Sequence, residues 1–264
     1  MGIPIYQVDA FTDTPFKGNP AAVCVLDSEA DAQWMQNLAA EMNLSETAFV
    51  RPVENKWELR WFTPITEVPL CGHATLASAH LLWDSGRADE DAPIVFRTLK
   101  SGKLTCVKRD GWISMDFPKD VPEPRDPPKG MLDALRVASH AVSHCRFHWL
   151  VELPDKESVL SVSPDFAALS RVVDCSVCVT SVSDDGDPYD FVSRYFAPWA
   201  GIDEDPVTGS AHCYLGPYWT QRFGRDQIIG LQASKRSGIV KMHVRDTRVD
   251  ISGQAVTVFA GELR

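Results

Sequence analysis

Two turns in this sequence carry polar residues that could do chemistry. Residues 67–73 read E-V-P-L-C-G-H, and residues 203–212 read D-E-D-P-V-T-G-S-A-H. In each turn a glycine, Gly72 or Gly209, stands where a helix is predicted to begin. Helix N-termini carry unpaired amides and partial positive charge, and glycine lets a ligand approach the backbone. Either glycine alone is explained by a simple turn, whereas the pair favours a site for an anionic group such as a carboxylate.

The side chains around these glycines also have ordinary structural explanations. Asp205 and Ser210 suit helix capping and charge compensation in a first helical turn, and His73 suits a first turn without chemistry. A third segment, N-L-S-E-T-A-F-V at 43–50, places Glu46 at the entry of a strand beside small hydroxyl residues. A single glutamate is usually a solvated surface residue, and the pattern alone does not change that expectation.

Strands are expected to position these residues, with a few helices between them. Alternating or β-branched runs predict strands at 3–11, 21–26, 57–62, 104–109, 112–117, 190–196 and 249–259. Helices are predicted over 28–42, opened by Ser28, and over 73–84 and 210–222. The mixture predicts a strand-rich α+β protein.

An internal repeat is visible between the two halves. R-W-F-T-P at 60–64 is followed by G-H-A and an apolar helix that ends near Trp83. R-Y-F-A-P at 194–198 is followed by G-S-A and an apolar stretch that ends near Trp219. Chance convergence of strand–turn–helix patterns is the rival explanation, but the shared order of residue types favours a duplicated unit.

A proline-rich segment separates the halves. Residues 118–130 read P-K-D-V-P-E-P-R-D-P-P-K-G, and proline lacks the amide donor that a central strand or helix needs. The sequence therefore predicts an N-terminal domain over 1–117, a linker over 118–130 and a C-terminal domain over 131–253. The last strand, near 254–264, is a candidate to return to the first domain.

Composition and charge exclude several classes of function. The chain has 264 residues with a net charge of −10, which opposes non-specific nucleic-acid binding. The seven cysteines are scattered and odd in number, so a reducing compartment, the cytoplasm, is expected. Cys175 and Cys178 form an isolated C-x-x-C in a strand-like run, and the spacing shows no clustered ligand set, so we expect no metal. No apolar run is long enough to span a bilayer, so no membrane partner is expected.

Long segments of the chain resemble the phenazine-biosynthesis PhzF-like family. The segments are VDAFTDTPFKGNPAAV (8–23), MNLSETAFV (42–50), LRWFTPITEVPLCGHATLASAHLL (59–82), SRYFAPWAGIDEDPVTGSAHCYLGPYW (193–219) and ISGQAVTVFAGEL (251–263). The resemblance implies the fold of diaminopimelate epimerase. That fold has two pseudo-symmetric domains, each a curved β-sheet around a central helix, with the active site in the cleft between them.

The resemblance also implies a function and a set of site residues. It implies an isomerase without a cofactor that shifts a proton on a small cyclic or conjugated carboxylate, and a homodimer, because family members commonly form dimers. The implied catalytic residues are Glu46, as general acid/base, with His73 and Asp205. The implied substrate-binding residues are Asn19, Ser45, Gly72, Thr208, Gly209 and Ser210.

Two departures from the family pattern leave alternatives open. The family's late R-G-G turn is replaced by K-R-S-G at 235–238. Related epimerases use two cysteines as bases, and here Cys71 stands in the first position but Thr208 stands in the second. A threonine hydroxyl is far too weakly acidic to replace a thiol. An amino-acid racemase that uses Cys71 is therefore one alternative, and a non-catalytic binding protein is the other.

Overall fold

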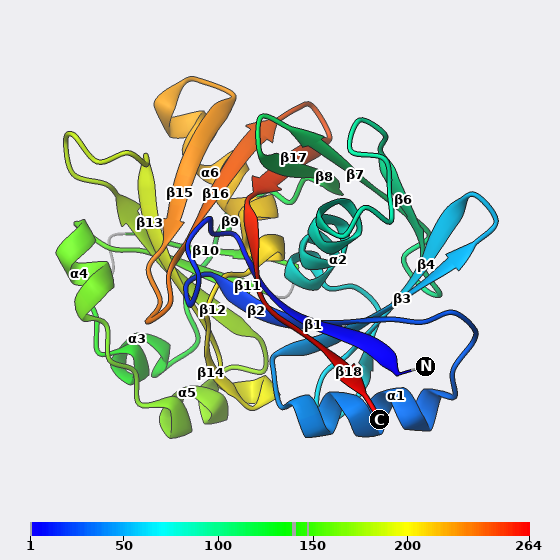
Figure 1. Ribbon diagram of the computed structural model, residues 1–264. Coiled ribbons are helices and arrows are strands. Elements are labelled where there is room, and N and C mark those ends of the chain that lie inside the picture. Colours follow the sequence, from blue (N-terminus) through cyan, green and yellow to red (C-terminus); the bar gives the residue numbers. More distant parts are fainter. Residues whose placement is uncertain (1, 139–140, 147) are drawn as a thin grey trace. The chain divides into compact units, whose positions relative to one another are not determined.

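The chain forms two compact units. The computed structural model describes residues 2–138, 141–146 and 148–264 (Figure 1). Unit 1 comprises Met1–Asp116 together with Ser252–Arg264, and unit 2 comprises Phe117–Ile251.

Unit 1 combines a mostly antiparallel set of strands with two helices. Its elements are β1 (Ile3–Ala10), β2 (Asn19–Val25), α1 (Ala32–Met42), β3 (Glu46–Val53), β4 (Lys56–Phe62), β5 (Glu67–Val68), α2 (Gly72–Asp84), β6 (Ile94–Arg97), β7 (Lys103–Arg109), β8 (Trp112–Pro118) and β18 (Ala255–Leu263). Strand β8 runs past the unit boundary at Asp116.

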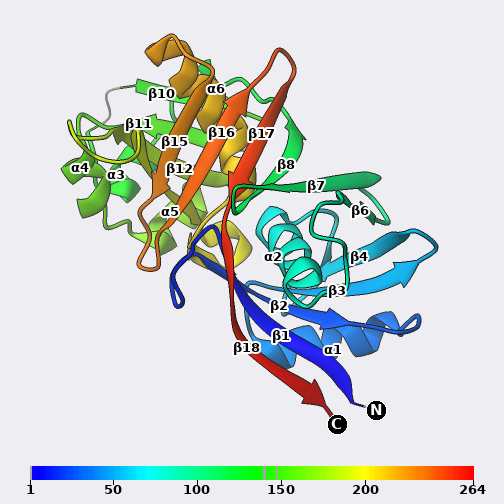
Figure 2. The same cartoon turned by 45° about the horizontal axis from the view of Figure 1, so that its top comes forward.

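The two helices of unit 1 lie on opposite faces of its sheet (Figures 1 and 2). Helix α2 packs against β1, β2, β3 and β18, and ten of its 13 residues are buried, so it is the central helix of the unit. Helix α1 covers a smaller apolar cluster that includes Cys24, Met35 and Phe49. Successive residues of a strand point to opposite faces of the sheet, so β2 contributes side chains to the contacts of both helices.

Unit 2 repeats this plan with more helices. Its elements are β9 (Glu123–Pro124), α3 (Met131–Leu135), β10 (Ala141–Cys145), β11 (His148–Glu152), α4 (Lys156–Ser161), α5 (Phe166–Val172), β12 (Ser176–Val182), β13 (Phe191–Ala197), the 3₁₀ turn η1 (Pro198–Ala200), β14 (Ile202–Asp205), the 3₁₀ turn η2 (Gly209–Ala211), α6 (His212–Phe223), β15 (Gln227–Gln232), β16 (Gly238–Val244) and β17 (Arg248–Gly253). Strand β17 runs past the unit boundary at Ile251.

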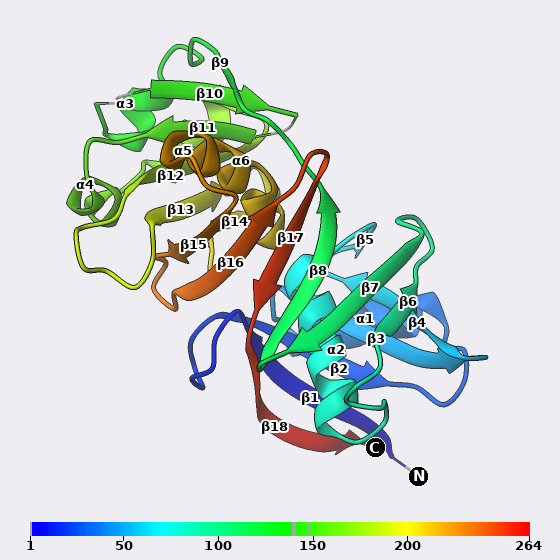
Figure 3. The ribbon, with the colours of Figure 1, turned by 90° about the horizontal axis from the view of Figure 1, so that it is seen from above.

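The central helix of unit 2 is α6. It lies beside β15 and β16 (Figure 3), and the indole of Trp219 donates to Thr180 Oγ1 of β12. The neighbouring residues of β12, Val177 and Val179, point the other way into an apolar cluster with residues of α3, α4 and α5. Helices therefore cover both faces of this sheet.

The two units have the same strand topology. In unit 1, β1–β2 pair antiparallel, β2–β3 parallel, β3–β4 and β4–β5 antiparallel, β4–β6 parallel and β6–β7 antiparallel. In unit 2, β10–β11, β11–β12, β12–β13, β13–β14, β13–β15 and β15–β16 pair with the same directions in the same order. The central helix follows β5 in one unit and β14 in the other. The internal repeat predicted from the sequence is therefore present in the fold.

A side-chain arrangement is repeated as well. Arg60 of β4 makes a bidentate ion pair with Glu67 of β5, and its guanidinium lies 5.2 Å from the ring centre of Phe62. In unit 2, Arg194 of β13 makes a bidentate ion pair with Glu204 of β14, and its guanidinium lies 5.1 Å from the ring centre of Phe196.

Some sequence predictions needed correction. Helix α1 begins at Ala32 rather than at Ser28, because the Asp31 carboxylate accepts hydrogen bonds from the backbone N–H groups of Gln33 and Trp34. The run 249–259 forms parts of two strands, β17 and β18, separated at Gln254. The proline-rich segment 118–130 falls inside unit 2, and its residues Glu123–Pro124 pair with β10.

Candidate active site

Glu46, Cys71 and His73 form a compact polar cluster in unit 1. His73 lies in the first turn of α2, and its Nε2 is 3.2 Å from Oε2 of Glu46, the first residue of β3. Its Nδ1 is 3.5 Å from Sγ of Cys71, the N-cap residue of α2. The imidazole therefore lies between a carboxylate and a thiol, and all three side chains are largely buried.

Several contacts fix this cluster to the fold. Glu46 is held in β3 by parallel pairing with Ala21 of β2. The Thr75 hydroxyl donates to the Cys71 carbonyl over 2.5 Å, which supports the backbone turn just before α2. The Ser45 hydroxyl donates to Oδ1 of the fully buried Asn19 over 3.4 Å. The structure thus brings together the predicted residues Asn19, Ser45, Glu46, Gly72 and His73.

The ionisable groups of the cluster shift the pKa values of His73 and Cys71. Burial opposes protonation of His73, but the negative charges available on Cys71 and Glu46 outweigh burial and raise the pKa of His73 well above its ordinary value. Burial, and next the Glu46 carboxylate, raise the pKa of the Cys71 thiol. The pKa values of His73 and Cys71 therefore depend on each other, and the raised pKa of His73 favours an imidazolium at neutral pH.

The same three residues could contact a metal ion. Their ligand atoms lie within 4.8 Å of one another, so the expectation that no clustered ligand set exists is wrong for Glu46, Cys71 and His73. The spacing in the sequence did not reveal this, because the fold brings β3 to the start of α2. Both ring nitrogens of His73 already contact its neighbours, so a metal must displace one contact. That the protein works without a metal stays a prediction.

The predicted residues of unit 2 lie in a single turn between β14 and α6. Asp205 is the last residue of β14, and its Oδ2 accepts a short hydrogen bond from the Thr208 hydroxyl. Gly209 begins the 3₁₀ turn η2, which leads into α6 at His212, so the α-helix begins later than predicted. Ser210 is exposed within this turn.

Sequence reasoning missed two residues that hold this turn, Gln232 and His212. Both are fully buried and hydrogen-bonded to Thr208. His212 lay inside a quoted motif, but only its contacts show that it serves the turn. A polar residue in the apolar run of β15 is a signal for Gln232, although the sequence cannot tell which partner it finds.

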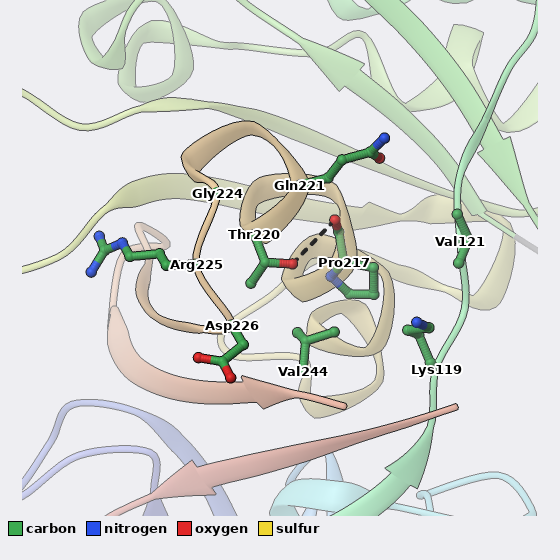
Figure 4. Close-up of a pocket in the computed structure, with 9 residues that line it drawn as sticks. All are labelled: Lys119, Val121, Pro217, Thr220, Gln221, Gly224, Arg225, Asp226 and Val244. Carbon is green, nitrogen blue, oxygen red and sulfur yellow. Dashed lines mark hydrogen bonds between the residues drawn. The ribbon is translucent and has the colours of Figure 1, made fainter. Parts of the chain in front are cut away.

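A surface pocket of unit 2 contains none of the predicted residues. It has a volume of about 640 Å³ and is lined by Lys119, Val121, Pro217, Thr220, Gln221, Gly224, Arg225, Asp226 and Val244 (Figure 4). Figure 4 shows Pro217 inside α6, where it cannot donate to the carbonyl of Cys213. The backbone N–H of Asp120 donates a hydrogen bond to that carbonyl instead, over 3.1 Å. This pocket therefore forms where the 119–121 segment crosses α6.

Comparisons with known proteins agree with this fold. A family model described as "Phenazine biosynthesis-like protein" matches residues 8–261. An uncharacterised isomerase of Halalkalibacterium halodurans is 49% identical over all of this chain and 99% of its own length. Phenazine biosynthesis-like domain-containing protein 2 of Mus musculus is 40% identical over the same shares.

Solved structures confirm the predicted fold class. A PhzF-family phenazine biosynthesis protein of Enterococcus faecalis is 40% identical and superposes with a TM-score of 0.94, with 100% of both chains covered. A predicted epimerase of Pseudomonas aeruginosa, 21% identical, superposes with a TM-score of 0.74 over 99% of both chains and shows the fold alone. None of the described helices is long and apolar enough to cross a membrane.

Proposed function

Because the chain belongs to the phenazine biosynthesis-like family, we propose that it is a cofactor-independent isomerase that shifts a proton on a small cyclic or conjugated carboxylate. Relatives named as isomerases support the general class of reaction. One observation carries the finer assignment, namely Glu46 at the entry of β3 with the buried His73 imidazole 3.2 Å away. Glu46 is the general acid/base in this proposal.

The proposed reaction needs no external reagent. The Glu46 carboxylate accepts a proton from one substrate carbon, and the electron pair of the broken C–H bond moves into the conjugated system. The carboxylic acid then returns the proton to another atom of the same system, so atoms and electrons balance. The His73 imidazolium, next to Glu46, supplies positive charge where the substrate gains negative charge.

The remaining predicted residues are proposed to bind and orient the substrate. We assign this role to Thr208, Gly209 and Ser210 of unit 2, in a turn whose backbone is already fixed by hydrogen bonds, and Asp205 of the same turn remains a proposed catalytic residue that also orients the substrate. In unit 1 we assign it to Asn19, Ser45 and Gly72. Fixed donors and acceptors would prevent the substrate from drifting during proton transfer.

A racemase mechanism that uses Cys71 is a weaker explanation of this site. Such a mechanism needs a thiolate, but burial and the Glu46 charge raise the pKa of Cys71. At the second position, the Thr208 hydroxyl donates to Asp205 and is too weakly acidic to act as the partner base.

Deuterium exchange separates these mechanisms. A panel of cyclic and conjugated amino and hydroxy acids is incubated with the protein in heavy water, and deuterium uptake is followed by NMR. Replacing Glu46 by Gln should lower exchange at least about a hundredfold, since it removes the group that moves the proton. Replacing Cys71 by Ser should have a much smaller effect. The same Glu-to-Gln change at the exposed Glu54 is the matched control.

The opposite order of effects would contradict the assignment. If exchange survives in Glu46→Gln and is lost in Cys71→Ser, the racemase mechanism is correct. If wild-type protein exchanges none of the compounds, the non-catalytic binding alternative gains support. Melting temperatures of all variants are compared first, so that loss of folding is not mistaken for loss of chemistry.

A further inference from the structure

The carboxamide of Gln232 joins both ends of the turn that contains Asp205 and Thr208. Gln232 is the last residue of β15, and its side chain is fully buried. Its Oε1 accepts from the backbone N–H of Thr208 over 2.8 Å, and its Nε2 donates to the backbone carbonyl of Asp205 over 2.8 Å. Nε2 also lies 3.3 Å from Thr208 Oγ1. One amide therefore uses its acceptor and both of its donor directions on this turn.

His212 holds the same turn from the helix side. Its Nδ1 is 2.9 Å from the backbone carbonyl oxygen of Thr208. A carbonyl oxygen can only accept, so Nδ1 carries the hydrogen. Burial lowers the pKa of His212 to about 4, so the ring is neutral at physiological pH and this tautomer is the stable one. The N–H and the C=O of Thr208 are thus both bound by buried side chains from outside the turn.

We propose that Gln232, together with His212, is a positioning residue that fixes the Asp205–Ser210 turn for substrate binding. The proposal rests on the proposed function, in which this turn orients the substrate. Neither side chain is expected to touch the substrate, because each is fully buried and is hydrogen-bonded to the turn, His212 through Nδ1 and Gln232 through its carboxamide. Their effect reaches the substrate through the Asp205 carboxylate and through the amides of Gly209 and Ser210.

Gln232 and His212 together are called the clamp, and the geometry explains why the turn needs it. The Thr208 hydroxyl binds the Asp205 carboxylate, so the side chain of Asp205 moves whenever the backbone of Thr208 moves. Gly209 follows directly and has no side chain to anchor it. A free turn of this kind would sample several conformations, and a misplacement of about 1 Å can lower an enzymatic rate about a hundredfold.

Two substitutions of Gln232 test this clamp without any substrate. Gln232→Leu keeps the approximate size and removes every polar contact, so the Thr208 amide should exchange with solvent at least about tenfold faster in NMR hydrogen exchange. Gln232→Glu keeps an acceptor for that amide but loses the donor to Asp205. A buried glutamate has a raised pKa, and its protonated form restores one donor.

The Glu variant therefore gives a pH signature that a general packing defect does not give. Its folded-state pKa lies above the unfolded value of about 4.3. Its melting temperature should be nearest to wild type below about pH 4 and should fall further behind as the pH rises towards 8. A difference from wild type that does not change with pH would contradict the clamp.

Activity on whichever panel compound wild type exchanges fastest provides the second measurement. In Gln232→Leu, kcat/KM should fall at least about tenfold, mainly through kcat, because the substrate binds to a turn that is no longer held in place. Leu231→Ala is the matched control, since the neighbouring residue packs on the opposite face of the sheet. Even if Leu231→Ala lowers the melting temperature as much as Gln232→Leu does, it should keep kcat/KM within about threefold of wild type.

The His212 variants separate hydrogen bonding from packing. The Ala211 amide also donates to the Thr208 carbonyl, over 3.1 Å. Asn places an amide N–H near the position of Nδ1, so His212→Asn should retain slow exchange of the Ala211 and Thr208 amides, and His212→Leu should not. Unchanged Thr208 exchange in Gln232→Leu, or equal losses of kcat/KM in Gln232→Leu and Leu231→Ala, would overturn the proposal. If wild type exchanges no compound, the proposed function fails, and hydrogen exchange at Thr208 still decides whether the clamp exists.

Discussion

The protonation state of His73 is the most informative quantity to measure in unit 1. The distance of 3.2 Å between Nε2 and Glu46 Oε2 corresponds to a charge–charge attraction of about 5 kcal/mol at an effective dielectric constant of about 20. Burial lowers the pKa of His73, but the charge available on Cys71 and this attraction to Glu46 together raise it well above its ordinary value. We therefore expect His73 to stay protonated at neutral pH, whereas an isolated imidazole loses its proton near pH 6.5.

Replacing Glu46 by Gln removes the carboxylate charge and keeps the shape of the side chain. Burial then opposes protonation with less compensation, so the pKa of His73 should fall by about one to three pH units. The assay is an NMR titration of the imidazole resonances between pH 5 and pH 9, assigned with a His73→Gln variant. Glu54→Gln at an exposed position is the control. Cys71→Ser should also lower the pKa of His73, because the charge available on Cys71 helps to raise it.

The same titration has a consequence for stability. Because the folded-state pKa of His73 is raised, its stabilising contribution is fully present below the unfolded value of about 6.5 and is lost as the pH rises through the folded value. Glu46→Gln should lack this pH dependence. A wild-type His73 that titrates below pH 6.5, or a pKa that does not move in Glu46→Gln, would refute the charge state on which the proposed mechanism rests.

Two further predictions concern the scaffold that positions the site. Arg194→Met should lower the free energy of unfolding, measured in urea, by about 3–5 kcal/mol, and Arg60→Met should lower it by less. The difference is expected because Arg194 also donates to the carbonyls of Val159, Leu160 and Val162 at the end of α4. Equal losses would contradict this reasoning. Asp9→Asn should lower the free energy of unfolding by about 1–3 kcal/mol in the same assay, since the buried Asp9 carboxylate accepts a hydrogen bond from the Phe16 N–H over 2.7 Å. A loss below about 0.5 kcal/mol would contradict this prediction.

The elements that the sequence predicted well are those with a strong periodic pattern. Helix α2 was predicted within one residue, because an apolar run follows a glycine turn. Strand β4 was predicted for the same kind of reason, since its side chains alternate. Helix α1 was predicted to begin too early, because Ser28 and Asp31 are both good capping residues and only the hydrogen bonds of Asp31 decide between them.

The candidate site was predictable only in its separate parts. The motifs place His73 in a first helical turn and Glu46 at a strand entry, but no pattern shows that the two side chains meet. Likewise, Gln232 lies 24 residues from Thr208, and a buried hydrogen bond over that separation leaves no periodic signal. Contacts between segments depend on the folded backbone, which local sequence patterns do not determine.

The two copies of the internal repeat differ in the turns that carry their polar residues. The Arg–Phe pattern recurs at the same spacing in both units, but Glu67 lies 7 residues after Arg60 and Glu204 lies 10 residues after Arg194. The longer turn of unit 2 has the 3₁₀ turn η1 before β14. Duplication has therefore preserved the scaffold and allowed the turns that carry the polar residues to change.

The positions just before each central helix differ in their chemistry. In unit 1, Cys71 contacts the imidazole of His73 and leaves it beside Glu46. In unit 2, the Thr208 hydroxyl donates a hydrogen bond to the Asp205 carboxylate. The backbone of Thr208 is held by hydrogen bonds to Gln232 and His212. A pair of equivalent bases would need similar groups in both turns, whereas unit 1 has the Glu46–Cys71–His73 cluster and unit 2 has a hydrogen-bonded turn. This asymmetry supports the proposal that a single base, Glu46, both removes the proton and returns it.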